Sequence, residues 1–418
     1  MKSLYYNVNP LGWATTLWLK RFWTGALFSS LNGLTLRDVP MPTPPGDNWV
    51  ICKTLLGGIC GTDLGIITQK QPANSILQEF STAPMRLGHE NVAVVDQVGP
   101  GVDKSWVGKR VIADPTLCCE VRGITPPCEP CSRGEFGACE NFGTTISSEN
   151  SPEVTPGTSI GYCGDLGGAF SEYFPAHVSS LTEIPQEIPD ELAILTDPLA
   201  CSLHSVLRAD LSKAKRVLVY GAGVLGLGVI ACLRAVGFTG EIHAANRSAN
   251  PKQLAEEFGA DLFYQPASKT PERYKQVAEL TGAKVHRARF GNYMLSGGYD
   301  IVFDCVGTPG VFQDCLKFSA ARGQVVMVAT SSGGKLDLTP VWFRELSVIG
   351  VFGRQLEDFA GEKLHTNSLV HKFMLEGKLN VGKMLTHTFP VDQYKKAFES
   401  AIFKSANRSI KVAFDFRK

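Results

Sequence analysis

The sequence predicts an α/β protein in which a β-rich part and a doubly wound parallel sheet share one chain. Three observations support this prediction. Residues 1–190 consist mostly of short strand-like runs broken by Gly, Pro and Asp. From about residue 212 onward, short apolar strands alternate with helical segments. The length of 418 residues exceeds what one hydrophobic core usually spans, so we expect two or more domains.

The expected elements follow from local pattern. In the first part, strand-like runs rich in Val, Ile and Leu cover residues 48–60, 91–99 and 109–115. In the second part we expect strands at 215–223, 241–245, 262–264, 299–307 and 323–329. The helices expected between them cover 224–237, 251–258 with Asn250 as N-cap, 271–280 and 310–318. After residue 354 a helix over 367–379 and a late strand are expected.

Composition excludes several classes of protein. Hydrophobic residues make up 44% and charged residues 19% of the chain, which is typical of a globular protein. A formal net charge of +1 gives no overall basic character, so no nucleic-acid partner is expected. Five of the 12 cysteines lie between Cys118 and Cys139, and such clustering indicates metal binding more than a disulfide framework.

The N-terminal stretch LGWATTLWLKRFWTGALFSS (residues 11–30) is apolar and aromatic. Lys20 and Arg21 interrupt it, so it is too short for a membrane-spanning helix, and the charges are misplaced for a signal peptide. We expect a strand followed by a packed N-terminal excursion. We therefore expect a cytoplasmic protein without a membrane partner.

A glycine pattern marks a candidate dinucleotide site. Gly221, Gly223 and Gly226, with Val224 and Leu225 between the last two, follow a predicted strand and open a predicted helix. In that context the glycines permit a tight turn, and the N–H groups that begin the helix bind a pyrophosphate. The alternative is a tight turn without a ligand.

The end of the next strand indicates which dinucleotide. An NAD site usually has Asp or Glu about 20 residues after the glycines, whereas this chain has Asn246, Arg247 and Ser248. A guanidinium in place of an acid suits the 2′-phosphate of NADP. We therefore expect NADP to be preferred over NAD; the alternative for Arg247 is a solvated loop charge.

Further motifs together resemble one family. Cys60 lies in GxCGTD, His89 and Glu90 lie in GHE, and Cys128, Cys131 and Cys139 form a CxxC-x7-C element. With GGAFSEYF (167–174) and the dinucleotide half in the expected order, the chain resembles the zinc-dependent alcohol dehydrogenases of the medium-chain dehydrogenase/reductase superfamily, in particular polyol, threonine and glucose dehydrogenases. The resemblance implies a GroES-like catalytic domain over 1–197, to which 351–418 return, and a Rossmann domain over 198–350.

The resemblance also implies a catalytic zinc. Its ligands would be Cys60, His89 and the acidic residue Asp197 of an (E/D)P motif, with Glu90 as a nearby or exchanging fourth ligand. Asp197 could instead cap a helix, and Cys201, four residues on, is a rival ligand.

Other residues of the catalytic centre also have counterparts in the family. Asp63 resembles the acid that orients the zinc-bound histidine, and Thr62 resembles the hydroxyl that relays the proton. Gly65 stands near the position where some members carry a relay histidine, and His204 is expected to be structural.

The resemblance implies a structural zinc held by four cysteines. The family spacing places the first of them at Thr125, which is no ligand, so Cys118 or Cys119 must complete the set. We favour Cys119, because the loop that follows contains Gly and two prolines and could fold back. A metal-free lobe with packed thiols is the alternative.

Several expectations complete the interpretation. Val306 and Thr330 follow strand ends where dinucleotides bind, and Phe352 is a candidate neighbour of the nicotinamide. Residues 283–298, with His286, Arg287 and Arg289, form an insertion that lines an interface or a pocket, or is simply solvated.

The expected activity is hydride transfer between an alcohol, polyol or sugar hydroxyl and NADP, by a homodimer or homotetramer. The alternatives are a zinc-independent enone or quinone reductase of the same superfamily and a non-catalytic protein that binds zinc and nucleotide.

Overall fold

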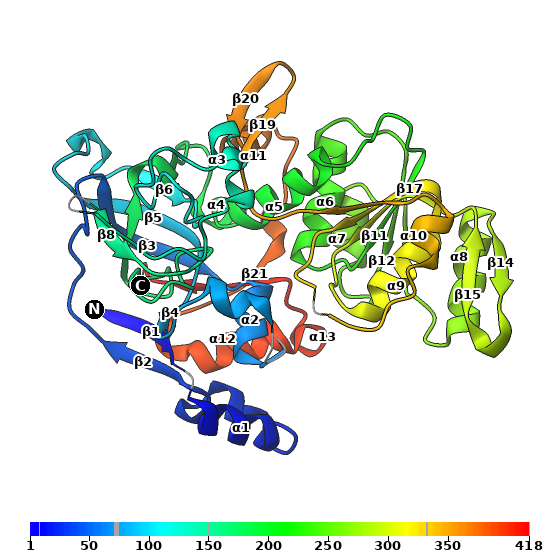
Figure 1. The fold of residues 1–418 in the computed structure, drawn as a ribbon, viewed down its shortest axis with the longest axis horizontal. Helices are drawn as coiled ribbons and strands as arrows, with labels where there is room; N and C mark the ends of the chain where they lie inside the picture. Colours follow the sequence, from blue (N-terminus) through cyan, green and yellow to red (C-terminus); the bar gives the residue numbers. More distant parts are fainter. Residues whose placement is uncertain (8, 71–74, 149–150, 332, 418) are drawn as a thin grey trace. The chain divides into compact units, whose positions relative to one another are not determined.

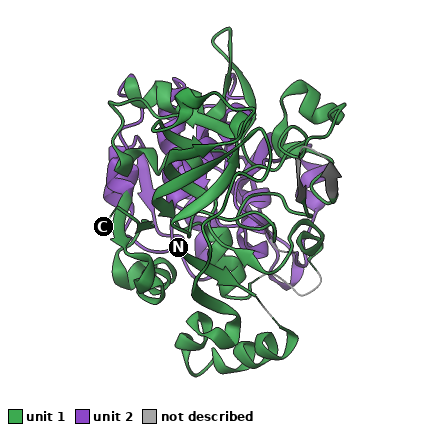
Figure 2. Ribbon diagram, turned by 90° about the vertical axis from the view of Figure 1, so that its left-hand side faces the viewer, with its two compact units in different colours: residues 1–197, 353–375, 385–418 green, residues 198–352, 376–384 purple. Residues whose placement is uncertain are grey.

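The computed structural model describes residues 1–7, 9–70, 75–148, 151–331 and 333–417 (Figure 1). The chain divides into two units (Figure 2). Unit 1 comprises Met1–Asp197, Gly353–Leu375 and Leu385–Lys418, and unit 2 comprises Pro198–Phe352 and Glu376–Met384. Residues 376–384, which we expected in the returning C-terminal part, thus group with unit 2.

Unit 1 contains a seven-stranded sheet in the order β10-β6-β5-β3-β22-β21, and β9 also pairs with β3. The central strand β3 is buried along most of its length, with Lys53 as its exposed residue. The strands are β3 (Trp49–Gly58), β5 (Glu90–Val98), β6 (Arg110–Ala113), β9 (Tyr173–His177), β10 (Leu181–Glu183), β21 (Leu385–Phe389) and β22 (Lys411–Asp415).

Smaller sheets and helices complete unit 1. A three-stranded sheet has the order β2-β1-β4, and β7 pairs with β8 and β19 with β20. These strands are β1 (Lys2–Tyr6), β2 (Leu34–Asp38), β4 (Met85–Arg86), β7 (Ile146–Ser148), β8 (Ser151–Val154), β19 (Leu356–Phe359) and β20 (Glu362–His365). The helices are α1 (Pro10–Leu19), α2 (Gly61–Ile67), α3 (Glu129–Arg133), α4 (Asp190–Ala193), α11 (Thr366–Leu375), α12 (Tyr394–Ile402) and α13 (Lys404–Asn407), and α5 (Thr196–Leu207) runs from unit 1 into unit 2.

Unit 2 is built on a six-stranded parallel sheet in the order β13-β12-β11-β16-β17-β18. The chain starts at β11, proceeds outward to β13, and then returns to β16 on the other side of β11. This reversal is the switch point at which doubly wound sheets bind dinucleotides. The strands are β11 (Arg216–Tyr220), β12 (Glu241–Ala245), β13 (Leu262–Tyr264), β16 (Tyr299–Asp304), β17 (Ser319–Met327) and β18 (Ser347–Gly350).

The helices of unit 2 alternate with these strands. They are α6 (Val224–Ala235), α7 (Lys252–Glu257), α8 (Thr270–Thr281), α9 (Pro309–Phe318) and α10 (Thr339–Phe343). The expected alternation is confirmed, and α10 and β18 are additional elements that the sequence did not predict. Pro251, not Asn250, is the N-cap of α7. The insertion forms a hairpin of β14 (Lys284–Arg287) and β15 (Tyr293–Ser296).

Within the described residues, no helix combines the length and the apolar character needed to cross a bilayer.

Candidate functional site

Three predicted ligands of the catalytic metal meet at the end of the β3–β5 pair. Cys60 lies two residues after β3 and is the N-cap of α2, whereas His89 immediately precedes β5, whose first residue is Glu90. The antiparallel register places Gly58 opposite Glu90. One ligand atom from each of Cys60, His89 and Glu90 therefore lies within 4.8 Å of the others.

A buried hydrogen-bond network holds the imidazole of His89. The hydroxyl of Tyr162 lies 2.9 Å from Nδ1 of His89 and donates to Oδ1 of Asp63, also at 2.9 Å. The other carboxylate oxygen of Asp63 accepts from the backbone N–H of Cys60 at 2.9 Å. Asp63 is fully buried and His89 nearly so. The network fixes the ring through Nδ1 and leaves Nε2 as the nitrogen available to a metal.

Neighbouring side chains in this pocket shift the pKa values of His89 and Cys60. Burial alone would lower the pKa of His89, but the Asp63 carboxylate and the Cys60 thiol raise it to about 10. Burial alone would raise the pKa of Cys60, but the His89 imidazole lowers it. The thiol and the imidazole therefore already favour the charged pair, and a bound cation would take the place of the imidazole proton.

Glu90 has a partner that sequence reasoning missed. The ammonium of Lys411, in β22, forms an ion pair with the Glu90 carboxylate and donates to the carbonyl of Ile59 at 3.1 Å. Lys411 is 1% exposed, and burial lowers its pKa to about 8. The only sequence signal is a lysine at the start of the apolar strand β22. Glu90 is thus shared between the candidate metal site and a buried cation.

Asp197 is not gathered with Cys60 and His89. It lies in the first turn of α5, is 4% exposed, and one of its carboxylate oxygens pairs with the guanidinium of Arg354. Because α5 begins at Thr196, Asp197 is not the helix N-cap either. Its ligand role, like that of Cys201, remains a prediction.

The Arg354 guanidinium continues into a second buried ion-pair cluster. It lies 3.9 Å from Asp114, which is also 2.9 Å from His365. Burial would raise the pKa of Asp114, but His365 and Arg354 hold it below its usual range. Neither Asp114 nor Arg354 belongs to a motif visible in one sequence.

Thr62 lies next to the candidate metal site. Its hydroxyl is 3.7 Å from the sulfur of Cys60, because both residues belong to the first turn of α2. Gly65, further along α2, faces open space at its Cβ position. The role of Thr62 as a proton relay remains a prediction.

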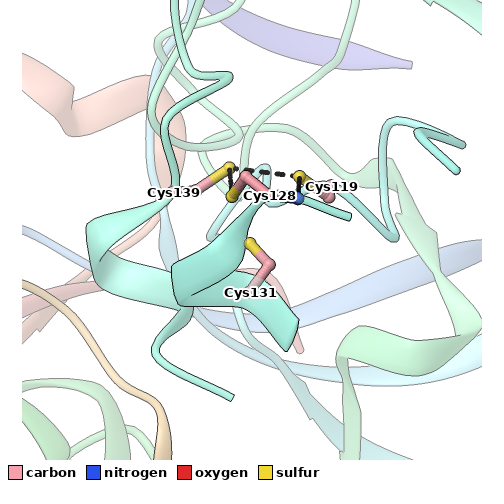
Figure 3. A group of neighbouring side chains, drawn as sticks. All are labelled: Cys119, Cys128, Cys131 and Cys139. Atoms are coloured by element: carbon pink, nitrogen blue, oxygen red, sulfur yellow. Dashed lines mark hydrogen bonds between the residues drawn. The ribbon is translucent and has the colours of Figure 1, made fainter. Parts of the chain in front are cut away.

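Four cysteines form a second cluster (Figure 3). The sulfur atoms of Cys119, Cys128, Cys131 and Cys139 lie within 4.8 Å of one another. Cys119 Sγ is 3.7 Å and Cys128 Sγ is 4.0 Å from Cys139 Sγ. A tetrahedral zinc with Zn–S bonds of about 2.3 Å has S–S edges of about 3.8 Å, so these separations fit zinc. Cys118 lies outside the cluster, and burial raises the pKa of its thiol to about 11.

N–H groups favour the thiolate form of Cys128 in this cluster, whereas burial raises the pKa values of Cys131 and Cys139. The amide of Asn141 donates to Cys119 Sγ at 3.1 Å, and the backbone N–H of Cys128 donates to the same sulfur at 3.3 Å. Burial opposes ionisation of Cys128, but N–H groups of Glu140 and Cys131 lower its pKa to about 7. The donor set thus fits a structural zinc.

In unit 2 the glycine motif forms a tight turn from β11 into α6. Gly221 has a φ of +101°, and a Cβ on Gly226 would lie 1.7 Å from the carbonyl oxygen of Gly221. Gly223 is the N-cap of α6, and its Cβ position faces open space. Val224 and Leu225 follow as the first residues of the helix. The turn therefore leaves room for a phosphate at the helix N-terminus.

The residues after β12 have divided roles. Asn246 Oδ1 accepts from the N–H of Ala222 at 3.1 Å and its amide donates to the carbonyl of Ser248 at 2.8 Å, so Asn246 braces the glycine turn. Arg247 is exposed, and its carbonyl accepts from Gln265 at 2.8 Å. Its guanidinium stands at the end of β12 without an acidic neighbour in sequence.

The other candidate cofactor contacts stand at the same edge of the sheet. Val306 follows β16, Thr330 follows β17 and Phe352 follows β18. Val306 is 41% and Phe352 52% exposed, and Thr330 is also exposed. Parallel strands end at one edge, so all three accompany the glycine turn there.

The remaining predicted residues lie elsewhere. His204 is buried in α5. In the β14–β15 hairpin, His286 hydrogen bonds with Ser296 at 2.8 Å, and His286, Arg287 and Arg289 are exposed. No role of the hairpin in a site follows from these contacts.

Comparison with known proteins gives consistent matches. Residues 46–186 match the sequence profile of the Alcohol dehydrogenase GroES-like domain, and residues 224–365 match that of Zinc-binding dehydrogenase. The L-threonine 3-dehydrogenase of Pyrococcus horikoshii is 30% identical over 386 residues, which is 91% of this chain and 95% of that protein. The (R,R)-butanediol dehydrogenase of Bacillus subtilis is 28% identical over 373 residues, or 88% and 92%.

A solved structure shows the same fold. It is a short chain alcohol dehydrogenase from Escherichia coli CFT073 complexed with NADH, similar with a TM-score of 0.73 at 23% identity over 100% of this chain and 99% of that one. The expected combination of a GroES-like domain and a Rossmann sheet is confirmed.

Proposed function

Because the chain belongs to the zinc-dependent alcohol dehydrogenases of the medium-chain dehydrogenase/reductase superfamily, we propose that it transfers a hydride between an alcohol, polyol or sugar hydroxyl and NADP. The observation that carries this proposal is the meeting of Cys60, His89 and Glu90 beside the hydroxyl of Thr62. A thiolate, an imidazole and a carboxylate suit a catalytic zinc site, which needs three protein ligands and one open position.

The proposed ligands divide into two kinds. Cys60 and His89 would hold the zinc directly, and either Asp197 or Glu90 would complete the set after release from Arg354 or Lys411. Bound zinc would lower the pKa of a coordinated alcohol. The four cysteines of the second cluster would hold a structural zinc that stabilises their lobe.

The protein's own groups perform the remaining tasks. Tyr162 and Asp63 hold His89 through Nδ1, so the imidazole keeps one orientation. Thr62, whose hydroxyl lies 3.7 Å from the Cys60 sulfur, would relay the proton of the alcohol: its oxygen would accept that proton while its own hydroxyl proton passes on to a ribose hydroxyl of the cofactor or to water. The glycine turn receives the pyrophosphate at the start of α6, with Val306, Thr330 and Phe352 as further contacts.

The preference for NADP rests on the end of β12. The region supplies Arg247 and Ser248 and no carboxylate, so a 2′-phosphate meets a cation and not an anion. Equal or better turnover with NAD at the same concentration would contradict this part of the proposal.

Assembly as a homodimer or homotetramer is also proposed. β18 is an edge strand of the parallel sheet, and Trp342 and Phe343 near it are 70% and 59% exposed. An unpaired strand edge with exposed aromatic side chains favours pairing with a second copy.

The test is formation of NADPH by zinc-replete protein with primary alcohols, secondary alcohols, polyols and aldoses, with NAD in parallel. We expect turnover with one class, abolished in Cys60→Ser and retained in Cys201→Ser. Reduction of an enone that survives Cys60→Ser would favour the zinc-independent reductase. Absence of turnover in both directions, together with absence of NADP binding, would favour the non-catalytic alternative.

A further inference from the structure

Residues 10–23, here called the aromatic segment, expose four of their seven large apolar side chains, and the other three are half-buried. Helix α1 buries Gly12 and Thr16, while Leu11 is 82% and Trp18 59% exposed. Immediately after the helix, Phe22 is 77% and Trp23 56% exposed. A surface helix of a globular protein normally buries its large apolar residues and exposes its small and polar ones. The aromatic segment instead buries Gly12 and Thr16 and leaves Leu11, Trp18, Phe22 and Trp23 exposed, so it packs less completely than we expected.

The aromatic segment packs against unit 1 through the face of α1 that carries the small residues Gly12 and Thr16. A Cβ on Gly12 would lie 2.5 Å from the carbonyl oxygen of Leu31, so only glycine fits there. The amide of Gln69 donates to the carbonyl of Trp13 at 3.0 Å, and the ammonium of Lys20 donates to that of Thr68 at 2.9 Å. Thr68 and Gln69 directly follow α2. Figures 1 and 2 both show α1 at the periphery of unit 1.

Positive charge surrounds this apolar face. Residues 1–37 contain four basic and no acidic residues. Lys20 and Arg21 lie at the end of α1, and Lys20 feels the charges of both Arg21 and Lys70. Within the described part of the chain, no carboxylate forms an ion pair with Lys20, Arg21 or Lys70. Large exposed aromatic rings next to unpaired cations are typical of segments that lie in the interface of a bilayer.

Although the sequence led us to expect no membrane partner, we propose that the aromatic segment binds the surface of an anionic lipid bilayer. Trp18, Phe22 and Trp23 would enter the headgroup region, and Arg21 and Lys70 would face the lipid phosphates. A second copy of the chain fits this surface less well. A two-fold contact would bring the same cations of both copies together, without acidic residues of the segment to compensate them.

The test is co-sedimentation of the full-length, zinc-replete protein with vesicles. One set contains phosphatidylcholine alone, and in the other a third of the lipid is phosphatidylserine. We expect binding to the anionic vesicles, which weakens at high salt. Trp18→Ser with Phe22→Ser should weaken it more than about tenfold. Arg21→Glu with Lys70→Glu should weaken it at least about 25-fold, from roughly fivefold per charge.

Matched controls come from unit 2. Phe290, which lies between β14 and β15, is another exposed aromatic residue, with a relative exposure of 106%. Phe290→Ser, and Lys284→Glu with Lys335→Glu, should leave vesicle binding unchanged.

Two results would overturn the proposal. One is binding that is absent at low salt or equal in the Trp18/Phe22 variant and the wild type. The other is an unbound wild type whose oligomer dissociates in the Trp18/Phe22 variant, as measured by light scattering, because a second copy would then cover the face.

Discussion

Replacing Tyr162 by Phe tests whether the buried network holds the candidate metal site. The hydroxyl of Tyr162 bridges two groups at 2.9 Å each, whereas Nδ1 of His89 and Oδ1 of Asp63 are 3.6 Å apart, too far for a good hydrogen bond. Tyr162→Phe therefore leaves one acceptor and one imidazole nitrogen without their bridge. A buried polar group that loses its partner costs about 1–3 kcal/mol.

We expect zinc affinity at the catalytic site to fall by about 2 kcal/mol, or roughly thirtyfold. Losses of this size are typical when a group that orients a metal-binding side chain is removed. Competition with a chromophoric chelator measures this, and turnover at saturating zinc should largely recover. Tyr6→Phe is the matched control, because Tyr6 is 3% exposed in the same hydrophobic core and does not join the network. Zinc affinity that changes less than twofold in Tyr162→Phe, or equally in Tyr6→Phe, would refute the reasoning.

Three further predictions concern other parts of the chain. Cys119→Ser should lose one zinc per chain and lower the melting temperature by roughly 10 °C or more, whereas Cys118→Ser should do neither, as checked by metal analysis and thermal unfolding. Arg247→Ala should lower kcat/KM for NADP by about ten- to hundredfold and leave that for NAD nearly unchanged in steady-state kinetics, because it removes a charged hydrogen bond to the 2′-phosphate. Asp114, whose pKa is held below its usual range by His365 and Arg354, stabilises the fold above about pH 4, and this stability should fall as the pH decreases further. Denaturant unfolding measured across this range should show that the free energy of unfolding falls less steeply with decreasing pH in Asp114→Asn than in the wild type.

The sequence predicted the fold class because its signals are local. The β/α alternation of unit 2 follows from short apolar runs, helical periodicity and glycines at turns, and each expected element appears there. The residue boundaries of unit 2 were predicted less well. Residues 376–384 join unit 2 because long-range contacts decide unit membership, and no local pattern reports those contacts.

The candidate site was predictable where residues lie in motifs. Cys60, His89 and Glu90 stand in GxCGTD and GHE, and the structure brings them together through the β3–β5 register. Their partners could not be found in this way. Tyr162 and Lys411 reach the site from loops and strands far along the chain, and a single tyrosine or lysine carries no spacing signal.

Two expectations concern residues whose surroundings depend on contacts between distant parts of the chain, which the sequence does not report. Asp197 was assigned from its (E/D)P motif, but its pairing with Arg354 depends on a segment 157 residues away. The N-terminal excursion was expected to be packed because its residues are apolar. Composition alone does not report which helix face turns inward, and the tight contact at Gly12 turns the small face inward.

Zinc content measured together with turnover tests the central claim most directly. We expect two zinc ions per chain in the wild type and one in Cys60→Ser, with loss of NADP-dependent turnover but retention of the fold. A wild type with one zinc, lost in Cys119→Ser and kept in Cys60→Ser, together with undiminished turnover in Cys60→Ser, would contradict the assignment of a catalytic zinc to Cys60 and His89.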